Sequence, residues 1–216
     1  YDDTRYGHGT GEARDSTSRA NNGIGTAGGC NDCRLLNLRV GDSFITDVTD
    51  FAQAVIYATD LRAKVLQSAL GTVNMNNYTQ AALDYAWDNG MLTIASMADE
   101  NARHHNMPTA ANHTLPVHAI QQAGSKITEA RTFLEYHPCS NFGGPNFLSG
   151  SGNGCSSEAV GQTSGITGLV YSAGYKYGYD LSAGEVMQLL MMSADDIDVP
   201  ESRQPEAQDR WSQPGF

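Results

Sequence analysis

The stretch 151–174, SGNGCSSEAVGQTSGITGLVYSAG, constrains the fold of this chain more than any other. Glycine-rich turns lead into a long segment of small and apolar residues, in which glycine recurs at positions 161, 165, 168 and 174. Each such glycine in an exposed helix would cost about 1 kcal/mol relative to alanine. We therefore expect a helix that is buried and closely packed, with an apolar face made by Ile166, Leu169 and Val170.

Ser156 lies at the start of this segment, and its role has two interpretations. A serine in the first turn of a core helix is most often an N-cap. Alternatively, the helix start and its backbone N–H groups face a substrate, and the serine is a nucleophile. The stretch by itself favours the cap, so the rest of the chain decides.

The size and charge of the chain exclude several classes of protein. At 216 residues, of which 40% are hydrophobic and 17% charged, we expect an ordinary globular protein with a single domain over residues 1–216. The net charge of −11 argues against nucleic acid or an anionic membrane as the main partner. No apolar run has the length of a membrane span, and the start shows no signal-peptide pattern. The opening Tyr1-Asp2-Asp3 has the character of the interior of a longer polypeptide.

Strand and helix patterns alternate along the chain. The expected strands cover residues 34–40, 64–70, 91–96, 115–120 and 132–136. The expected helices have apolar positions at 51–61 after a cap at Asp47 or Thr49, cover 78–89 with Gly90 as the stop, and cover 182–193. This alternation predicts an α/β fold with a mostly parallel central sheet and helices on both faces. Functional groups in such sheets lie beyond the carboxyl ends of the strands, here near Gly71, at 95–101 and at the turn before Ser156.

Four cysteines, at positions 30, 33, 139 and 155, leave two alternatives open. They form disulfides, or they are buried unpaired thiols. The C-x-x-C pair follows two glycines in a loop, which disfavours redox chemistry, and no second ligand pair of similar spacing supports zinc.

Several short motifs, taken in order, resemble those of the subtilisin-like serine proteases (subtilases). They are GHGT at 7–10, NNGIGTAG at 21–28, ALG at 69–71, IASMADE at 94–100, CSNFG at 139–143 and GCS at 154–156. In the family these positions correspond to the histidine motif and its following segment, an edge of the substrate cleft, the oxyanion stretch, an S-N-Y-G segment and the nucleophile motif. Each motif is weak alone, but their joint order across nearly the whole chain is specific. The cysteine before Ser156 and the residues after it are similar to those of a bacterial branch of the subtilases.

The resemblance implies a serine endopeptidase that forms an acyl-enzyme on Ser156, with His8 as general base. The glycines on both sides of His8 are expected to leave its ring accessible. Two segments would wall the specificity pocket: Ala69, Leu70 and Gly71, and Ser96, Met97 and Ala98. The implied partner is a peptide or protein substrate, and the implied location is secreted or extracytoplasmic. Calcium sites are common in the family, but no D-x-D-x-D loop is present, so no metal site or cofactor is assigned and the acidic 195–198 turn is left as solvated surface.

The chain departs from the family pattern at three places. The aspartate motif should lie well upstream of the histidine, yet only seven residues precede His8, so we expect the acid, the closing segment and any pro-segment or further domain to lie outside this chain. Asp99 stands where the oxyanion asparagine is expected, and our hypothesis is that it donates in a neutral form maintained by burial. After His8, the family has small apolar residues, whereas this chain has Arg14 and Asp15, which either pair with each other or lie exposed.

Two rival functions remain beside the protease. A non-catalytic relative would keep the fold as a binding or structural module, which the altered positions make a real alternative. A different esterase or lipase is disfavoured because the histidine precedes the serine and G-x-S-x-G is absent.

Overall fold

The structure is a computed structural model that describes residues 7–41, 44–122, 134–143 and 148–195. Its helices are α1 (His8–Thr17), α2 (Val48–Asp60), α3 (Asn77–Asp88), α4 (Cys155–Lys176) and α5 (Ala183–Ser193). Its strands are β1 (Val65–Ser68), β2 (Leu92–Ser96), β3 (Thr114–Gln122), β4 (Leu134–Tyr136) and β5 (Leu148–Ser151). The acidic turn considered for calcium extends from Asp195 into residues outside the described part of the chain.

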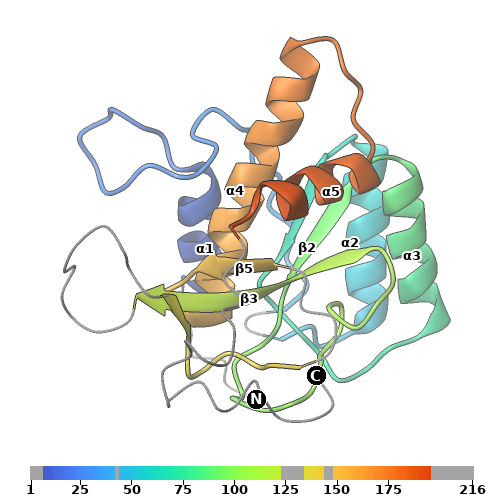
Figure 1. The fold of residues 1–216 in the computed structure, drawn as a ribbon. Coiled ribbons are helices and arrows are strands. Elements are labelled where there is room, and N and C mark those ends of the chain that lie inside the picture. The colour runs from blue at the N-terminus through green and yellow to red at the C-terminus, as the bar shows by residue number, and fades with distance from the viewer. Residues whose placement is uncertain (1–6, 42–43, 123–133, 144–147, 196–216) are drawn as a thin grey trace.

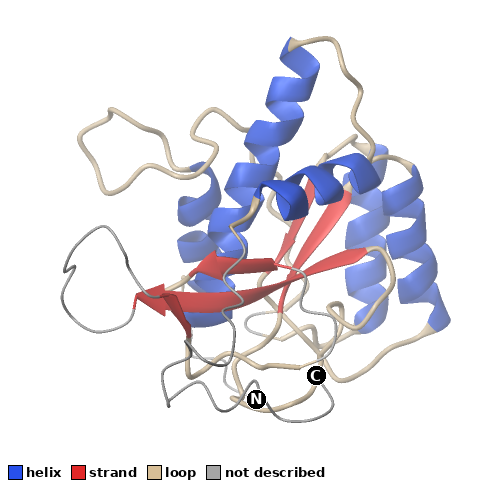
Figure 2. Ribbon diagram, viewed as in Figure 1, coloured by secondary structure: helices blue, strands red, loops and turns tan. Residues whose placement is uncertain are grey.

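The strands form one sheet in the order β1-β2-β3-β4, and β5 also pairs with β3 (Figure 2). β1, β2, β3 and β5 are parallel to their neighbours, whereas β4 is antiparallel to the end of β3. Parallel neighbours need crossover connections, and α3 provides one of them between β1 and β2. The mostly parallel sheet predicted from the sequence is confirmed.

Helices cover both faces of this sheet (Figure 1). Successive side chains of a strand point to opposite faces, so adjacent residues of β1 enter different cores. Leu66 packs into a core with Phe51 and Leu83 from α2 and α3. Val65 packs into a second core with Val160 and Val186 from α4 and α5. The α/β architecture with two helical layers is therefore as expected.

Side-chain caps define several helix ends. Asp47 is the N-cap of α2 and accepts a hydrogen bond from the Thr49 N–H at 2.7 Å, which settles the choice between these two residues. Gly90 follows α3 with a φ of 76°, the left-handed conformation in which glycine ends helices without strain. Ser182 and Glu185 form a reciprocal capping box at the start of α5.

The strand predicted at 34–40 is wrong. This segment has no regular structure, and Leu35 and Leu36 are 56% and 42% exposed. The pairing that the pattern anticipated occurs further along the chain, where Phe44 forms an isolated parallel bridge with Gly71. An apolar, branched segment forms a strand only where another strand offers hydrogen bonds, and the sequence pattern carries no information on that neighbour.

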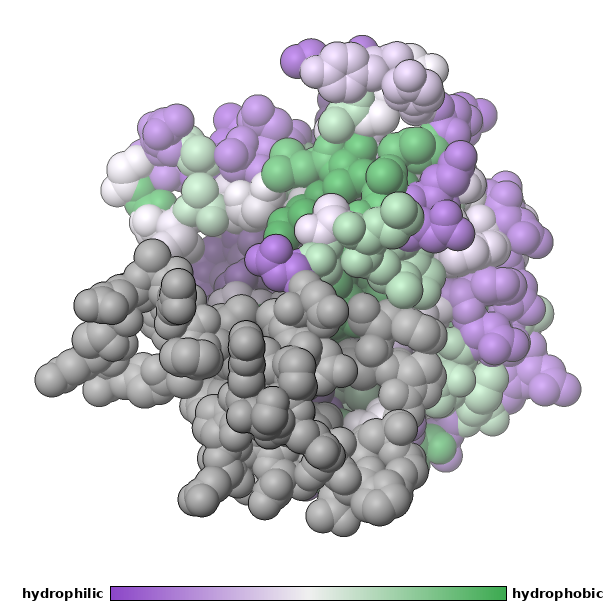
Figure 3. Space-filling model, viewed as in Figure 1, coloured by the Kyte–Doolittle hydropathy of each residue, from purple (hydrophilic) through white to green (hydrophobic). Residues whose placement is uncertain are grey.

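The buried face of α4 is its glycine face. A β-carbon added at Gly165 would lie 2.8 Å from the Gly29 Cα and 2.9 Å from the Ser16 carbonyl oxygen, so the close packing predicted for this helix is confirmed. The predicted apolar face is wrong in part, because Ile166 and Leu169 are about half exposed. Figure 3 shows apolar side chains exposed over α4 and α5.

None of the helices in the described ranges has both the length and the apolar character needed to cross a membrane.

Candidate active site

Ser156 is the second residue of α4 and is fully buried. Gly154 occupies the cap position, and no side chain caps the helix there, so the N-cap interpretation of Ser156 is wrong. Cys155 has a φ of 72°, a conformation that residues with a side chain rarely adopt and that concentrates at functional sites. The chain thus turns sharply into the helix at the predicted nucleophile.

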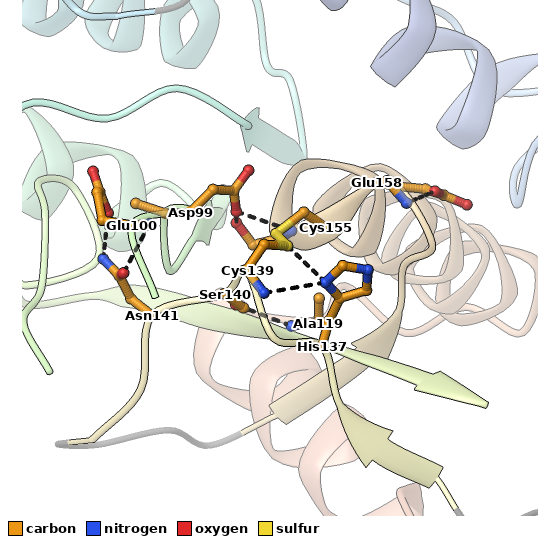
Figure 4. The surroundings of a disulfide bond; sticks show 12 residues. Asp99, Glu100, Ala119, His137, Cys139, Ser140, Asn141, Cys155 and Glu158 are labelled. Atoms are coloured by element: carbon orange, nitrogen blue, oxygen red, sulfur yellow. Dashed lines mark hydrogen bonds between the residues drawn. A yellow bond between two sulfur atoms is a disulfide. The ribbon is translucent and has the colours of Figure 1, made fainter. Parts of the chain in front are cut away.

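Asp99 lies against Ser156. Its Oδ1 accepts a hydrogen bond from the Ser156 N–H at 3.2 Å and another from the Ser156 hydroxyl. The hydroxyl of Ser96, the last residue of β2, also contacts the Ser156 hydroxyl. Asp99 follows β2 on a loop, and Figure 4 shows its carboxyl group directed at the start of α4. The prediction that the segment after β2 meets Ser156 is therefore confirmed.

The state expected for Asp99 differs from the one observed. In this structure the carboxyl oxygen accepts hydrogen bonds from Ser156, whereas an oxyanion donor must offer one. Asp99 as a residue is exposed, so the burial that we expected to keep it neutral is not found. Its role as a donor remains a proposal.

Asn141 holds the loop that carries Asp99. Its Oδ1 accepts hydrogen bonds from the N–H groups of Glu100 and Ala102 at 3.0 and 3.1 Å, and its backbone N–H donates to the Ala98 carbonyl at 2.8 Å. Its Nδ2 donates to the Glu100 carboxylate, as Figure 4 shows, and the residue is fully buried. The sequence analysis singled out the CSNFG motif but did not predict that Asn141 supports the Asp99 loop. The available signal was the amide residue within this short motif.

A disulfide joins Cys139, two residues before Asn141, to Cys155, next to the predicted nucleophile (Figure 4). The other disulfide is Cys30–Cys33, so of the two alternatives left open by the sequence, disulfides are found. His137 lies with its Nδ1 2.7 Å from the Cys139 sulfur. In the described part of the chain, His137 and these two cysteines form the group compact enough to hold a metal, but the sulfurs are bonded to each other and offer no thiolate.

His8 is the first residue of α1, after Gly7 with a φ of 86°. Its side chain is only 15% exposed, so the accessible ring expected from the flanking glycines is wrong. The ring lies in the first helical turn, where its Nε2 is 3.6 Å from the Oε1 of Glu12. Gly7 allows the backbone to turn into α1, but it does not expose the His8 side chain.

α1 runs alongside α4 in the same direction (Figure 1). The Glu12 carbonyl lies against Gly161, and the Ser16 carbonyl lies against Gly165, so both helices advance by one turn from one contact to the next. One turn earlier, the same register places His8 level with Ser157. The starts of the two helices, and with them His8 and Ser156, therefore lie at the same end of the pair.

The sequence model of the peptidase S8, subtilase family matches residues 2–211. This chain belongs to the subtilase family. Thermitase from Thermoactinomyces vulgaris is 31% identical over 121 residues, which are 56% of this chain and 43% of thermitase. A thermophilic serine proteinase from Bacillus sp. (strain AK1) is 29% identical over 116 residues, 53% of this chain and 29% of that protein. The chain thus spans less than half the length of these curated relatives.

Solved structures of other proteins share the fold of this subtilase. The patellamide maturation protease PatA has a TM-score of 0.75 at 19% identity, over 92% of this chain and 77% of PatA. Sphericase has a TM-score of 0.71 at 18% identity, over 88% of this chain and 70% of sphericase. At such identities the likeness shows the fold alone.

Glu12 is a buried carboxyl group beside His8 that sequence reasoning missed. Burial raises its pKa to about 7, and the negative charges of Asp15, Glu158 and Asp99 add to the rise, against a smaller effect of Arg14. The question left open for Arg14 is answered, because this residue is 60% exposed and lies 3.5 Å from the Asp15 carboxylate. A lone glutamate in a polar stretch gives no sign of burial in a sequence, but its spacing of four residues from His8 was visible.

The first segment predicted to wall a specificity pocket follows β1. The hydroxyl of Ser157 donates to the Ala69 carbonyl at 3.3 Å, which places this segment beside the start of α4. The Leu70 carbonyl accepts from the Ser68 hydroxyl at 3.1 Å, and the Gly71 carbonyl accepts from the Ile45 N–H at 3.1 Å. Ala69 is therefore near Ser156, while Gly71 is engaged by the chain before α2.

The second segment follows β2. Ser96 contacts Ser156 directly, and the Ala98 N–H donates to the Ser96 hydroxyl at 3.1 Å. Met97 as a whole residue is fully buried in this structure. Its role as a wall of the pocket remains a proposal.

Proposed function

We propose that this chain is the catalytic part of a serine endopeptidase that hydrolyses peptide bonds through an acyl-enzyme on Ser156. The observation that carries the proposal is the position of Ser156 in the first turn of α4, where Asp99 contacts it, at the same end of the helix pair as His8 on α1. The site belongs to a chain of the subtilase family, whose relatives include proteins named as serine proteinases.

In the proposed mechanism, His8 takes the proton of the Ser156 hydroxyl as this oxygen bonds to the scissile carbonyl carbon. The proton then passes to the departing amine as the carbon–nitrogen bond breaks, and water releases the acyl group in the second half of the cycle. The Ser156 N–H and the positive end of the α4 dipole stabilise the oxyanion, with Asp99 as the second donor in its protonated form.

The substrate is proposed to be a peptide or protein, bound beside Ala69 and Ser96, with a pro-segment or further domains supplied outside this chain. Two disulfides in the described part of the chain support a secreted or extracytoplasmic location, because disulfides persist in oxidising compartments. We assign no cofactor.

A fluorophosphonate probe tests the proposed function in the full-length protein. We expect covalent labelling that is lost in Ser156→Ala and in His8→Ala, with cleavage of a casein substrate lost in the same variants. A folded protein that is neither labelled nor cleaves casein would overturn the proposal in favour of a binding or structural module. Labelling that persists in Ser156→Ala would place the nucleophile elsewhere.

A further inference from the structure

The carboxyl group of Glu12 faces the predicted base across one turn of α1. Its Oε1 lies 3.6 Å from the His8 Nε2, and the side chains of Glu12 and His8 are only 13% and 15% exposed. An ion pair at this spacing on an exposed helix contributes little to stability. Partial burial strengthens the contact, because water screens it less.

The packing of α1 on α4 restricts where this carboxyl group can go. A β-carbon at Gly161 would lie 3.1 Å from the Glu12 Oε2 and 3.1 Å from its carbonyl oxygen. That Oε2 is buried without a hydrogen-bond partner among the described residues. On the other side, the Gln67 Nε2 donates to the Glu12 carbonyl at 3.0 Å and ties this turn of α1 to β1.

A buried carboxyl group that lacks a full set of hydrogen bonds is costly, and no structural need of α1 explains it. The helix ends at Thr17, and its next contact with α4, at Gly165, is made by the Ser16 carbonyl oxygen without the Glu12 carboxyl group. The group that gains from its presence is the His8 imidazole, which becomes positively charged when it accepts a proton.

We propose that Glu12 is a positioning residue for His8, whose carboxyl group orients the imidazole and stabilises the imidazolium formed during acylation. The inference rests on the proposed protease function. In the step, the proton of the Ser156 hydroxyl goes to the His8 Nδ1 and then to the leaving amine, while the His8 Nε2 keeps its own proton directed at the Glu12 carboxylate, which stays ionised.

The proposal predicts a pH dependence. The groups that act on Glu12 are His8, Arg14 and Asp15 on α1, Glu158 on α4 and Asp99 on the loop after β2. Because burial raises the pKa of Glu12 to about 7, its supporting charge develops near neutrality, where an ordinary imidazole becomes a base. The reaction rate should therefore rise near neutrality through two coupled ionisations.

The test measures the rate constant of fluorophosphonate labelling of the full-length protein from pH 5 to 9, in parallel with an NMR titration of the His8 ring protons. In Glu12→Gln we expect the plateau rate to fall about 100-fold, within the roughly 10⁴-fold loss seen when a triad aspartate is replaced. The rise of the labelling rate with pH should become that of a single ionisation. The His8 ring should titrate at lower pH than in the parent protein, because a neighbouring anion is lost. Glu12→Asp, which keeps the charge on a shorter stem, should be intermediate.

Asp15→Asn is the matched control, since this carboxylate is on the same helix and 17% exposed but pairs with Arg14. We expect its plateau rate to stay within about threefold of the parent. An unchanged rate profile and an unchanged His8 titration in Glu12→Gln would overturn the proposal. If the parent protein is not labelled at all, the protease function fails, and the His8 titration alone decides whether Glu12 acts on His8.

Discussion

The Asp99 carboxyl group accepts hydrogen bonds from both the backbone N–H and the hydroxyl of Ser156. One oxygen therefore occupies the space in front of the helix start where an oxyanion would form. In a working subtilase site this carboxyl must either donate as an acid or move away when substrate binds. Substitution of Asp99 therefore tests which of these two behaviours occurs at Ser156.

Asp99→Asn should keep or raise activity near neutral pH. An amide donates a hydrogen bond to the oxyanion at any pH, whereas a carboxyl group does so only when protonated. The measurement is kcat/KM on a peptide substrate from pH 5 to 9, where the ratio of variant to parent should grow as pH rises. Asp99→Ala, which removes any donor, should lose about 100-fold or more. A large loss in the asparagine variant would contradict the donor role.

Glu12→Gln should make the protein more stable at pH 8. The folded-state pKa of Glu12, about 7, is above its ordinary value of 4.5, so ionisation costs folding free energy as pH rises through this interval. The free energy of unfolding of the variant should exceed that of the parent by at most about 3 kcal/mol at pH 8, as measured by urea unfolding. The difference should vanish below pH 4.5. Higher stability together with lower activity would separate a functional group from a structural one.

Glu185→Gln provides the control of opposite sign for that measurement. Hydrogen bonds from Ser182 lower the pKa of Glu185, so its charge favours the folded state above its unfolded pKa. Its replacement should lower stability at pH 8 and have no effect at a pH where both residues are protonated. If Glu12→Gln behaves like Glu185→Gln, Glu12 is a structural residue.

His118 should make the protein less stable as pH falls from 6.5 towards 4. It is fully buried on β3, and burial lowers its pKa to about 4, so only the unfolded state binds a proton in this range. The contribution lost is roughly 3 kcal/mol for a shift of this size. Urea unfolding at several pH values should show a smaller loss of stability in acid for His118→Gln than for the parent protein.

Loss of the Cys139–Cys155 disulfide should cost more than loss of Cys30–Cys33. The paired positions are separated by 16 and 3 residues, so the loop-closure model gives about 3 and about 2 kcal/mol respectively. Double alanine variants compared by denaturant unfolding measure the difference. Loss of the Cys139–Cys155 disulfide should also lower the labelling rate of Ser156, because this disulfide joins the Asn141 loop to the turn into α4. Equal activity in both double variants would show that this link does not position the site.

The sequence was informative where local chemistry decides the structure. The cap at Asp47, the stop at Gly90 and the meeting of the β2 loop with Ser156 followed from residue types and from the rule that parallel strands end at one edge. It failed where a distant neighbour decides. The irregular backbone of residues 34–40, the exposure of Ile166 and Leu169 on α4 and the burial of Glu12 depend on which segments pack together, which no local pattern records.

The contacts between α1 and α4 have a consequence for how this site tolerates change. At Gly161 and Gly165 the two main chains touch, so the offset between His8 and Ser156 is set by backbone atoms and is independent of any side-chain rotamer. Substitutions on the outward faces, such as at Ile166 or Leu169, leave that offset alone, whereas one added methyl at Gly165 must push the helices apart. The outer surface is thus free to diversify through mutation while the proposed pair, His8 and Ser156, keeps its spacing.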